Sequence, residues 1–505
     1  MNSGFKSYAQ ENGGRVIVLF LLFLLALYNF YKAGLQGYLM VFGALPIIVI
    51  GCYLVFRFKM FAFWTLFFVN YFIMFITRHI SIGIPASFPN ELLELMLIAL
   101  AIIEINELKF EKLANLMFLS VLLWFGFCLL EVMNNTCGLG YRFDLWYTGA
   151  RLMSFQLVYA VMVCCIYVST PKRVITFLTF WGFCIIFATY WVWKQRNIGF
   201  TDAERAWLFS PAGRSHNISS GIRYFSMFTD AATFGIHMAA ASIAFFIFSI
   251  TTKIKKHKIY FIIIGILSLW SMFTSGTRTG IFCFILGGML YIVVSKNIKI
   301  ATSVSIVGLL LVSLLAFTKI GQGNQMIRRM RTAFDRNDAS ASVRDINKEA
   351  ISKYMKDAPW GIGIGLFVND IPAWNKFRIV SSIPPDSEYV FIWVRTGVIG
   401  VTIFALLNAL MLGGACYTSM FRIRSTSLRG IGAGFCCAFI AVQLGGYANQ
   451  VLMQFPNVLI FYGGLSIVYV LPLMETSWNE WEAKEIAKQE EKKRLKLEKK
   501  RASRV

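Results

Sequence analysis

Apolar segments long enough to cross a membrane recur along the whole chain, and short polar stretches separate them. A helix needs about 20 predominantly apolar residues to span the hydrocarbon core of a bilayer. The pattern therefore predicts an all-α integral membrane protein with about 12–14 transmembrane helices. The expected crossings are residues 15–31, 36–56, 60–77, 90–106, 113–131, 152–169, 174–193, 226–250, 259–273, 280–295, 300–318, 391–416, 430–453 and 457–474.

Two polar stretches are much longer than the others and divide the chain. The smaller stretch, 194–223, lies within a first block of eleven helices, 1–318. The larger stretch, 319–390, is a polar loop that contains arginines, a predicted helix, a glycine turn and an acidic run. It precedes three last helices in 391–474 and a charged tail, 475–505. We expect the large loop to carry the chemistry of the protein. The first apolar run shows no small-residue cleavage site, so it is expected to remain as a helix.

Composition and charge place the chain in a membrane and orient it there. The chain has 505 residues, of which 57% are hydrophobic, and its mean hydropathy is +0.62. A soluble protein could not bury so much apolar surface. The formal net charge is +23, and most Lys and Arg residues of the short loops fall on one side, together with the tail. The positive-inside rule therefore predicts cytoplasmic termini and an external large loop, and nucleic-acid binding is not expected.

Two arginines lie where external loops are expected to meet helices. Arg278 follows a turn of small residues, Thr274–Thr277, between two apolar segments. Such a turn would let a phosphate approach both the guanidinium and backbone amides, although a snorkelling arginine at a helix end is the alternative. Arg223 precedes Asp230 at the start of an apolar run. Capping of the next helix explains Asp230 as well as a functional role does.

The large loop contains a predicted helix that carries Arg344. Apolar residues recur there at helical spacing, with Ser342 as the expected cap and Pro359 after the end of the helix. The helix is expected to rest on the body of the protein, and Arg344 lies on it either as an anion-binding group or as part of a solvated face. The glycines of 361–365 indicate a tight turn or a close approach of the backbone.

Charged residues also follow the loop into the next helix. Asp386 and Glu388 come directly after two prolines. A carboxylate beside arginines can act as their counter-ion or can take the proton from an attacking hydroxyl group. Arg395 falls inside the following apolar segment, where a charge is costly, so it is a functional candidate by default.

Other polar groups receive structural interpretations. Glu94, within a predicted crossing, is expected to pair with Arg151 or Arg78, and a proton relay is the alternative. The cysteines lie almost entirely within apolar segments and are interpreted as small buried hydrophobic residues. The acidic run 335–338 has no third ligand in view, so no metal site is predicted.

The motifs of the second half resemble those of the O-antigen ligase and O-antigen polymerase superfamily (Wzy-type bacterial membrane glycosyltransferases). One motif is the turn Ser275–Gly280, and another is the large external loop with its arginine helix. The most specific motif is at the exit of the loop, where Asp386-Ser387 is followed by nine residues and then by Gly397-Val398-Ile399-Gly400. The ligases carry this spacing after a histidine. Asp386 takes the place of that histidine here, which favours the polymerase branch.

This resemblance implies an enzyme of the bacterial cytoplasmic (inner) membrane that transfers glycan from an undecaprenyl pyrophosphate carrier without a metal or other cofactor. The implied partners are lipid-linked donor and acceptor, membrane lipids, a chain-length regulator and a flippase. Arg278, Arg344, Arg223 and Arg395 would then bind pyrophosphate, and the carboxylates Asp386 and Glu388 would be catalytic.

Three other readings remain open. The chain could be a ligase that joins finished glycan to a lipid core or to a protein, since only the acceptor differs. It could be a polysaccharide or lipid transporter, although no repeated halves are visible. It could also be a passive scaffold, in which the arginines would be replaceable.

Overall fold

The computed structural model describes residues 59–80, 87–103, 110–211, 213, 216–218, 221–296 and 339–502, together with isolated residues between 299 and 331. Within these residues, nine helices are long and apolar enough to cross a membrane, and the shorter apolar helix α14 (Thr279–Val294) accompanies them. The prediction of an all-α membrane protein is confirmed. The expected crossings at 15–31 and 36–56, and almost all of 300–338, lie outside the described residues.

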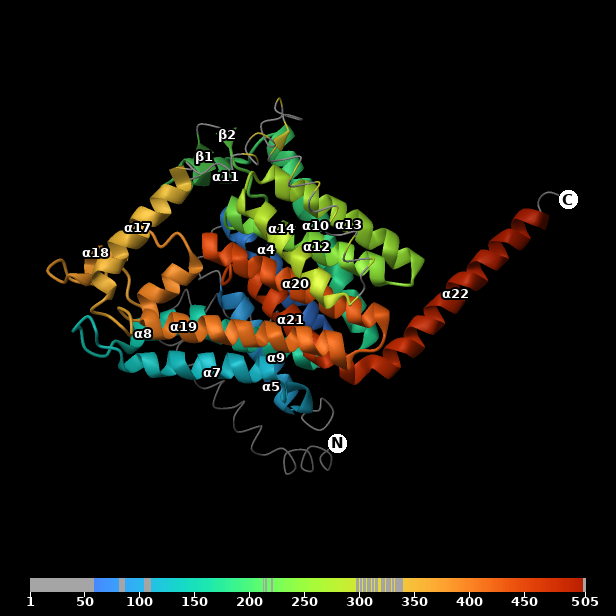
Figure 1. Ribbon diagram of the computed structural model, residues 1–505, viewed down its shortest axis with the longest axis horizontal. Helices are drawn as coiled ribbons and strands as arrows, with labels where there is room; N and C mark the ends of the chain where they lie inside the picture. Colours follow the sequence, from blue (N-terminus) through green and yellow to red (C-terminus); the bar gives the residue numbers. More distant parts are fainter. Residues whose placement is uncertain are drawn as a thin grey trace, which may run out of the picture. The chain divides into compact units, whose positions relative to one another are not determined.

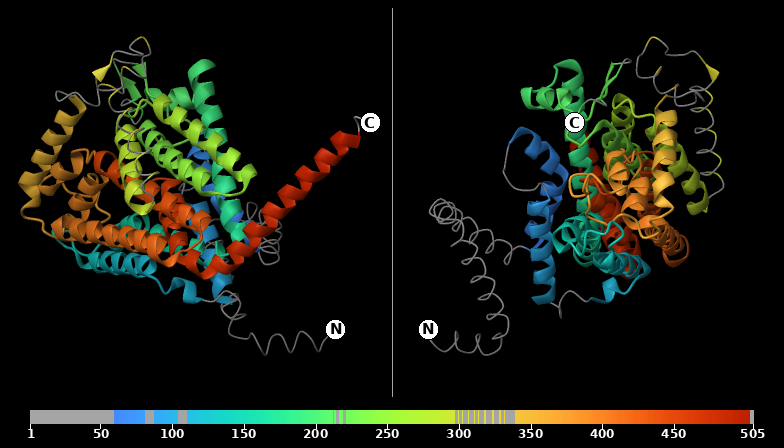
Figure 2. Two further views of the ribbon diagram at one scale, coloured as in Figure 1. Left: turned by 45° about the vertical axis from the view of Figure 1, so that its right-hand side comes forward. Right: turned by 90° about the vertical axis from the view of Figure 1, so that its left-hand side faces the viewer.

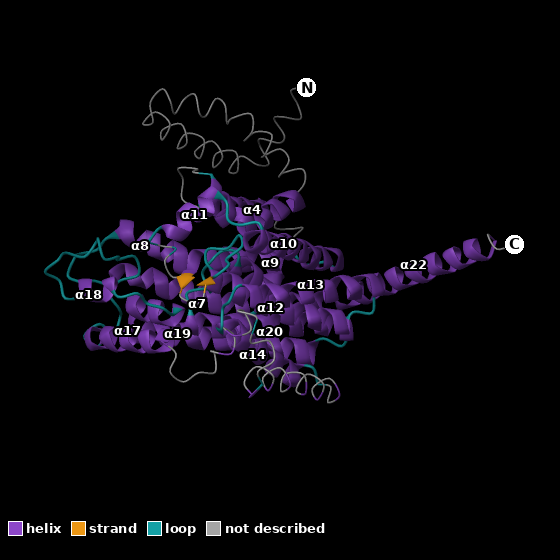
Figure 3. Cartoon of the chain, turned by 90° about the horizontal axis from the view of Figure 1, so that it is seen from above, coloured by secondary structure: helices purple, strands orange, loops and turns teal. Residues whose placement is uncertain are grey.

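The described elements are nearly all helices, as Figure 3 shows. The first half contains α4 (Lys59–His79), α5 (Phe88–Ile103), α7 (Leu116–Leu130), α8 (Phe143–Ala150), α9 (Gln156–Tyr167), α10 (Pro171–Asn197), α11 (Asp202–Phe209), β1 (Asn217–Ile218) and β2 (Gly221–Ile222). The second half contains α12 (Ala231–Thr251), α13 (Lys255–Thr274), α14, α17 (Ala339–Met355), α18 (Phe377–Ser382), α19 (Glu388–Tyr417), α20 (Thr426–Ala448), α21 (Gly463–Val470) and α22 (Glu475–Ala502).

The chain divides into two units, 1–64 and 65–505, and the site described below lies in the second. At the centre of this second unit is α12, which is almost entirely buried and packs against α13, α14 and α20. Small residues permit this close packing: a Cβ atom on Gly235 would lie 2.3 Å from the Ser275 hydroxyl oxygen. The start of α12 is therefore held tightly against the turn that carries Arg278.

Helix α19 runs beside α7, as Figure 1 shows, and it is broken near its start. The break is at Gly397, whose φ of 69° favours glycine. The carbonyl oxygen of Pro359 accepts a hydrogen bond from the Ile399 N–H at 3.3 Å across this break. The first glycine of the loop-exit motif thus has a structural reason, because a Cβ atom there would collide with the Pro359 carbonyl group.

In the large loop, the predicted helix is confirmed as α17, but two details of the prediction were wrong. The helix begins at Ala339, so Ser342 lies within it and does not cap it. Only the C-terminal part of the apolar stripe is buried: Ile351 is fully buried, whereas Val343 and Ile346 are more than half exposed. This half-exposed helix is visible at one edge of the molecule in Figure 2.

The glycine turn 361–365 makes a close backbone contact, as expected. A Cβ atom on Gly365 would lie 1.7 Å from the carbonyl oxygen of Leu145 in α8, so only glycine fits there. One intramembrane pairing differs from the prediction, because Arg151 lies 3.3 Å from the carboxylate of Glu91 and forms no ion pair with Glu94. Since Glu91 precedes Glu94 by about one helical turn, the chain pattern could not choose between them.

Candidate active site

The turn that carries Arg278 is fixed to the start of α12. Helix α13 ends at Thr274, and Gly276 adopts a positive φ of 66°, which reverses the chain. The Thr277 hydroxyl group then donates a hydrogen bond of 2.6 Å to the carbonyl oxygen of Ala231. Arg278 follows this turn and is the residue immediately before α14.

Arg223 lies beside the same turn. Its Nη2 donates a hydrogen bond of 3.2 Å to the Thr277 hydroxyl oxygen, and its Nε is buried without a hydrogen-bond partner among the described residues. Asp230 caps α12 by accepting hydrogen bonds from Ala232 and Thr233, so the expected capping role is present. Asp230 also acts electrostatically on Arg223, so it serves both purposes.

Helix α17 brings Arg344 and Asp386 to one place. Nδ2 of Asn347 donates a hydrogen bond of 2.8 Å to Oδ2 of the Asp386 carboxylate. Arg344 lies three residues before Asn347 and is, like it, partly buried, so the two side chains share one face of the helix. Asp386 is therefore held by a residue that lies about one helical turn from Arg344.

Three arginines from distant parts of the sequence converge here. Burial lowers the pKa of Arg223, Asp230 opposes this effect, and the charges of Arg278 and Arg344 lower the pKa further. Burial also lowers the pKa of Arg278, and Arg344 adds to the effect. Because each arginine disfavours the charge of the others, the cluster concentrates positive potential at one place. We call Arg223, Arg278 and Arg344 the arginine cluster.

A neighbouring histidine, His216, remains neutral chiefly because it is buried. Burial and then the charge of Arg223 lower the pKa of His216 to about 4, and Asp230 partly opposes them. The Nε2 of His216 accepts a hydrogen bond of 3.0 Å from the Ala231 N–H at the start of α12. His216 thus helps to hold the start of α12 beside the arginine cluster, and it adds no charge near neutral pH.

Sequence reasoning missed the segment that joins these parts, residues 449–454, which we call the linking segment. Asn449 donates to the hydroxyl oxygen of Thr279 at 3.4 Å, beside Arg278. Gln450 donates to the carbonyl oxygen of Pro385 at 2.8 Å, beside Asp386. Gln454 accepts a hydrogen bond from Thr229, beside Asp230. The available signal was this run of amides within an otherwise apolar region.

Glu388 and Arg395, the other two predicted site residues, have different surroundings. Glu388 is buried, and its carboxylate accepts a hydrogen bond of 3.0 Å from the Leu452 N–H, so it anchors the linking segment. Arg395 is also buried, and Asp370 and Cys137 are the ionisable groups that act on it. The structure therefore brings Arg223, Arg278, Arg344 and Asp386 together but gives Arg395 a separate position.

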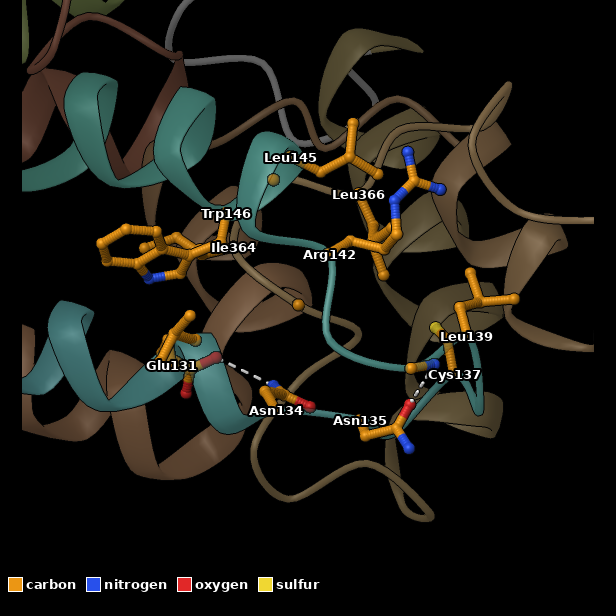
Figure 4. Close-up of a pocket in the computed structure, with 14 residues that line it drawn as sticks. Glu131, Asn134, Asn135, Cys137, Leu139, Arg142, Leu145, Trp146, Ile364 and Leu366 are labelled. Atoms are coloured by element: carbon orange, nitrogen blue, oxygen red, sulfur yellow. Dashed lines mark hydrogen bonds between the residues drawn. The ribbon is translucent and has the colours of Figure 1, made fainter.

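The glycine turn helps to line a recess, which Figure 4 shows. Glu131, Asn134, Cys137 and Arg142 contribute to its lining, together with 363–366. The polar groups at its rim are already engaged: Glu131 accepts a hydrogen bond from Asn134, and Arg142 pairs with Asp144 at 2.8 Å. The recess lies apart from the arginine cluster, and we assign it no role in the chemistry.

The cluster and Asp386 can perform complementary steps of one reaction. Guanidinium groups bind phosphate oxygens through two parallel hydrogen bonds and stabilise negative charge that develops on them. A carboxylate held by one oxygen, as Asp386 is held by Asn347, keeps its second oxygen available to accept a proton. The arrangement suits displacement of a phosphate leaving group by a hydroxyl group.

A comparison with protein families identifies the central part of the chain. Residues 263–405 match the family model described as O-antigen ligase. This segment contains Arg278, Arg344 and Asp386, but it contains neither Arg223 nor the linking segment. The match supports the superfamily that the motifs predicted, whose members are membrane glycosyltransferase-like enzymes. A comparison with curated proteins gave no match.

Proposed function

We propose that this multi-pass membrane protein, whose residues 263–405 match the O-antigen ligase family model, polymerises lipid-linked oligosaccharide repeat units. The donor would be a glycan on an undecaprenyl pyrophosphate carrier, and the reaction would take place at the outer face of the bacterial cytoplasmic membrane. The observation that carries the proposal is the convergence of Arg223, Arg278 and Arg344 beside Asp386.

The proposed reaction is a glycosyl transfer in one displacement. A hydroxyl oxygen of the acceptor forms a bond to the anomeric carbon of the donor, while the bond from that carbon to the phosphate oxygen breaks. The electron pair of the broken bond remains on the lipid pyrophosphate, and the arginine cluster stabilises its growing charge. The proton of the acceptor hydroxyl group passes to Asp386 as the new bond forms.

The residue at position 386 supports polymerisation over ligation. The resemblance puts a histidine in the ligases where this chain has Asp386, and here the Asp386 carboxylate accepts a hydrogen bond from Asn347. The chain therefore carries a different proton acceptor, together with a partner that orients it. Ligation remains the second candidate, because the family match covers both activities and only the acceptor separates them.

The charge distribution supports the proposed orientation. The cluster lies on the side of the membrane helices that carries the large loop, and the basic short loops and the tail are expected on the opposite, cytoplasmic side. A carrier lipid could then place its pyrophosphate at the cluster while its chain remains in the bilayer.

The test is glycan banding from cells that lack this chain and are complemented with wild type, Arg278→Ala or Asp386→Ala. Polymerisation predicts single-repeat product in the deletion and a ladder that only wild type restores. Long glycan that accumulates on the carrier lipid in the deletion would instead identify a ligase. A full ladder in every strain would exclude both activities.

A further inference from the structure

Arg395 lies in the last turn of α19 before the break at Gly397, and it is only 5% exposed. The two groups that act on it electrostatically are Asp370 and Cys137, and no member of the arginine cluster does so. Its environment is therefore electrostatically separate from the proposed site of glycosyl transfer.

The guanidinium group of Arg395 has aromatic neighbours but unused donors. It lies 4.3 Å from the ring centroid of Phe367 and 5.3 Å from that of Phe391. Its Nε and Nη1 are buried without a hydrogen-bond partner among the described residues, and no ion pair forms there either. Arg78 and Arg151 each have one such unpartnered nitrogen as well, but Arg78 donates to two carbonyl oxygens and Arg151 faces the carboxylate of Glu91. The Asp370 carboxylate acts on Arg395 but forms no ion pair with it, and a buried arginine without a directly paired carboxylate is unfavourable unless another anion joins it.

The backbone around Arg395 packs closely against the glycine turn 361–365. Gly363 donates a hydrogen bond of 3.1 Å to the Arg395 carbonyl oxygen, and Ile362 donates one of 2.9 Å to that of Val394. Gly361 has a φ of 77°, and a Cβ atom on it would lie 2.4 Å from the Arg395 carbonyl group. Broken helices with irregular backbone occur in membrane proteins where they are buried or where they form a ligand site.

We infer that Arg395 and its aromatic neighbours form a second anion site, which takes the pyrophosphate of a lipid-linked acceptor. This inference rests on the proposed function, because a polymerase joins two substrates that both carry pyrophosphate, whereas a ligase needs only one such site. Phe367 covers one face of the guanidinium and is itself 42% exposed. A movement of that single ring would open the unused donors to the ligand.

Pyrophosphate binding to the purified full-length chain tests the inference. The protein is placed in nanodiscs of zwitterionic lipid and titrated with inorganic pyrophosphate in a calorimeter. We expect two bound pyrophosphates per chain in wild type, with Arg395→Met losing one and Arg278→Met losing the other. Arg395→Lys keeps the charge but not the planar pair of donors, so it should weaken that site about tenfold or more. Arg378→Met, in the same loop, is the matched control and should retain both sites.

Thermal stability provides the second readout and separates ligand binding from a structural role. Removal of a buried charge that forms no ion pair should raise the midpoint of thermal unfolding of Arg395→Met in the absence of pyrophosphate, and should reduce the rise that pyrophosphate causes. A single bound pyrophosphate in wild type, or a lower midpoint with unchanged binding in Arg395→Met, would overturn the inference.

Two further outcomes locate a failure. Suppose Arg395 binds anionic phosphatidylglycerol in nanodiscs but binds no pyrophosphate in zwitterionic ones. The site then holds a bilayer headgroup, and the acceptor assignment is wrong. If Arg278→Met keeps full pyrophosphate binding while Arg395→Met loses it, the proposed function fails and the second site stands. If Arg278→Met loses pyrophosphate binding and Arg395→Met keeps it in full, the proposed function stands and the second site is rejected.

Discussion

Arg78 and the arginine cluster lie close to the same start of α12, yet their surroundings differ. Arg78 donates hydrogen bonds of 2.8 and 3.0 Å to the carbonyl oxygens of Phe228 and Thr229. Its guanidinium also lies 4.6 Å from the centroids of both Trp207 and Phe225. The protein itself thus supplies partners for Nη2 and for the faces of the Arg78 guanidinium, while its Nη1 is buried without a hydrogen-bond partner among the described residues.

The members of the arginine cluster instead act on one another as like charges. Among the described residues, the Arg223 side chain donates a hydrogen bond to Thr277, and its Nε is buried without a hydrogen-bond partner. Neither Arg223 nor Arg344 forms an ion pair with a carboxylate in the described part of the chain. Like charges held close together oppose one another, and an anion bound among them would relieve that repulsion, which is why we propose the cluster as the place where the substrate binds.

The largest expected effect is that of Asp386→Asn. The amide cannot take the proton of the acceptor hydroxyl group, so kcat should fall by about 10²–10⁴-fold while KM changes little. Turnover of a lipid-pyrophosphate repeat unit by the purified protein measures this effect. Asp357→Asn, an exposed carboxylate of the same loop that pairs with Lys376, is the control and should retain activity. Equal turnover of Asp386→Asn and wild type would remove Asp386 from the chemistry.

Arg278→Ala should lower kcat by about 10²–10³-fold, because it removes donors that stabilise the charge of the leaving pyrophosphate. Arg205→Ala, an exposed arginine on α11, is the matched control and should leave the rate unchanged. The same turnover assay applies. If the two variants lose activity equally, the cluster is no different from surface charge.

Arg78→Met should have the opposite profile. Two buried carbonyl oxygens lose their donor, which should destabilise the fold by about 2 kcal/mol or more. Turnover per folded molecule should change by only about threefold, because Arg78 does not face the substrate. Thermal unfolding together with active-site titration separates the two quantities. A variant of full stability with no turnover would place Arg78 among the substrate-binding groups.

The smallest expected effect concerns His216, because the charges of both Arg78 and Arg223 act on it. Its folded-state pKa of about 4 lies below the usual 6.5, through burial and the charges of Arg223 and Arg78. The unfolded chain therefore binds this proton first, and stability falls as pH decreases from about 6.5 to about 4. His216→Gln should flatten the dependence of the unfolding temperature on pH over that interval. An unchanged slope in the variant would show that another group is responsible.

The sequence predicted most of the helices because bilayer crossing imposes a length and a composition that a single chain reveals. It also selected Arg278, Arg344 and Asp386 as candidates, since charged residues at loop boundaries stand out against an apolar background. It could not separate Arg395 from the arginine cluster, because the break at Gly397 and the glycine turn that packs on it are tertiary features.

The linking segment was missed for a related reason. Its amides lie in a short stretch between two apolar runs, and such a stretch is expected to be a simple loop. Their structural role depends on hydrogen bonds with residues far away in the sequence. The exact partner of Arg151 depends in the same way on helix rotation, which periodicity alone does not fix.

Polymerisation at the arginine cluster is tested most directly with the purified protein in proteoliposomes. The protein receives one substrate, a synthetic repeat unit on undecaprenyl pyrophosphate. The measurement counts glycosidic bonds and lipid pyrophosphate released, in wild type and in Arg278→Ala. Polymerisation at the arginine cluster predicts a ladder in which each new bond releases one lipid pyrophosphate. It also predicts a rate about a hundredfold lower or more in Arg278→Ala. A ladder that forms at the same rate in both proteins, or a substrate that wild type leaves unchanged, would contradict it.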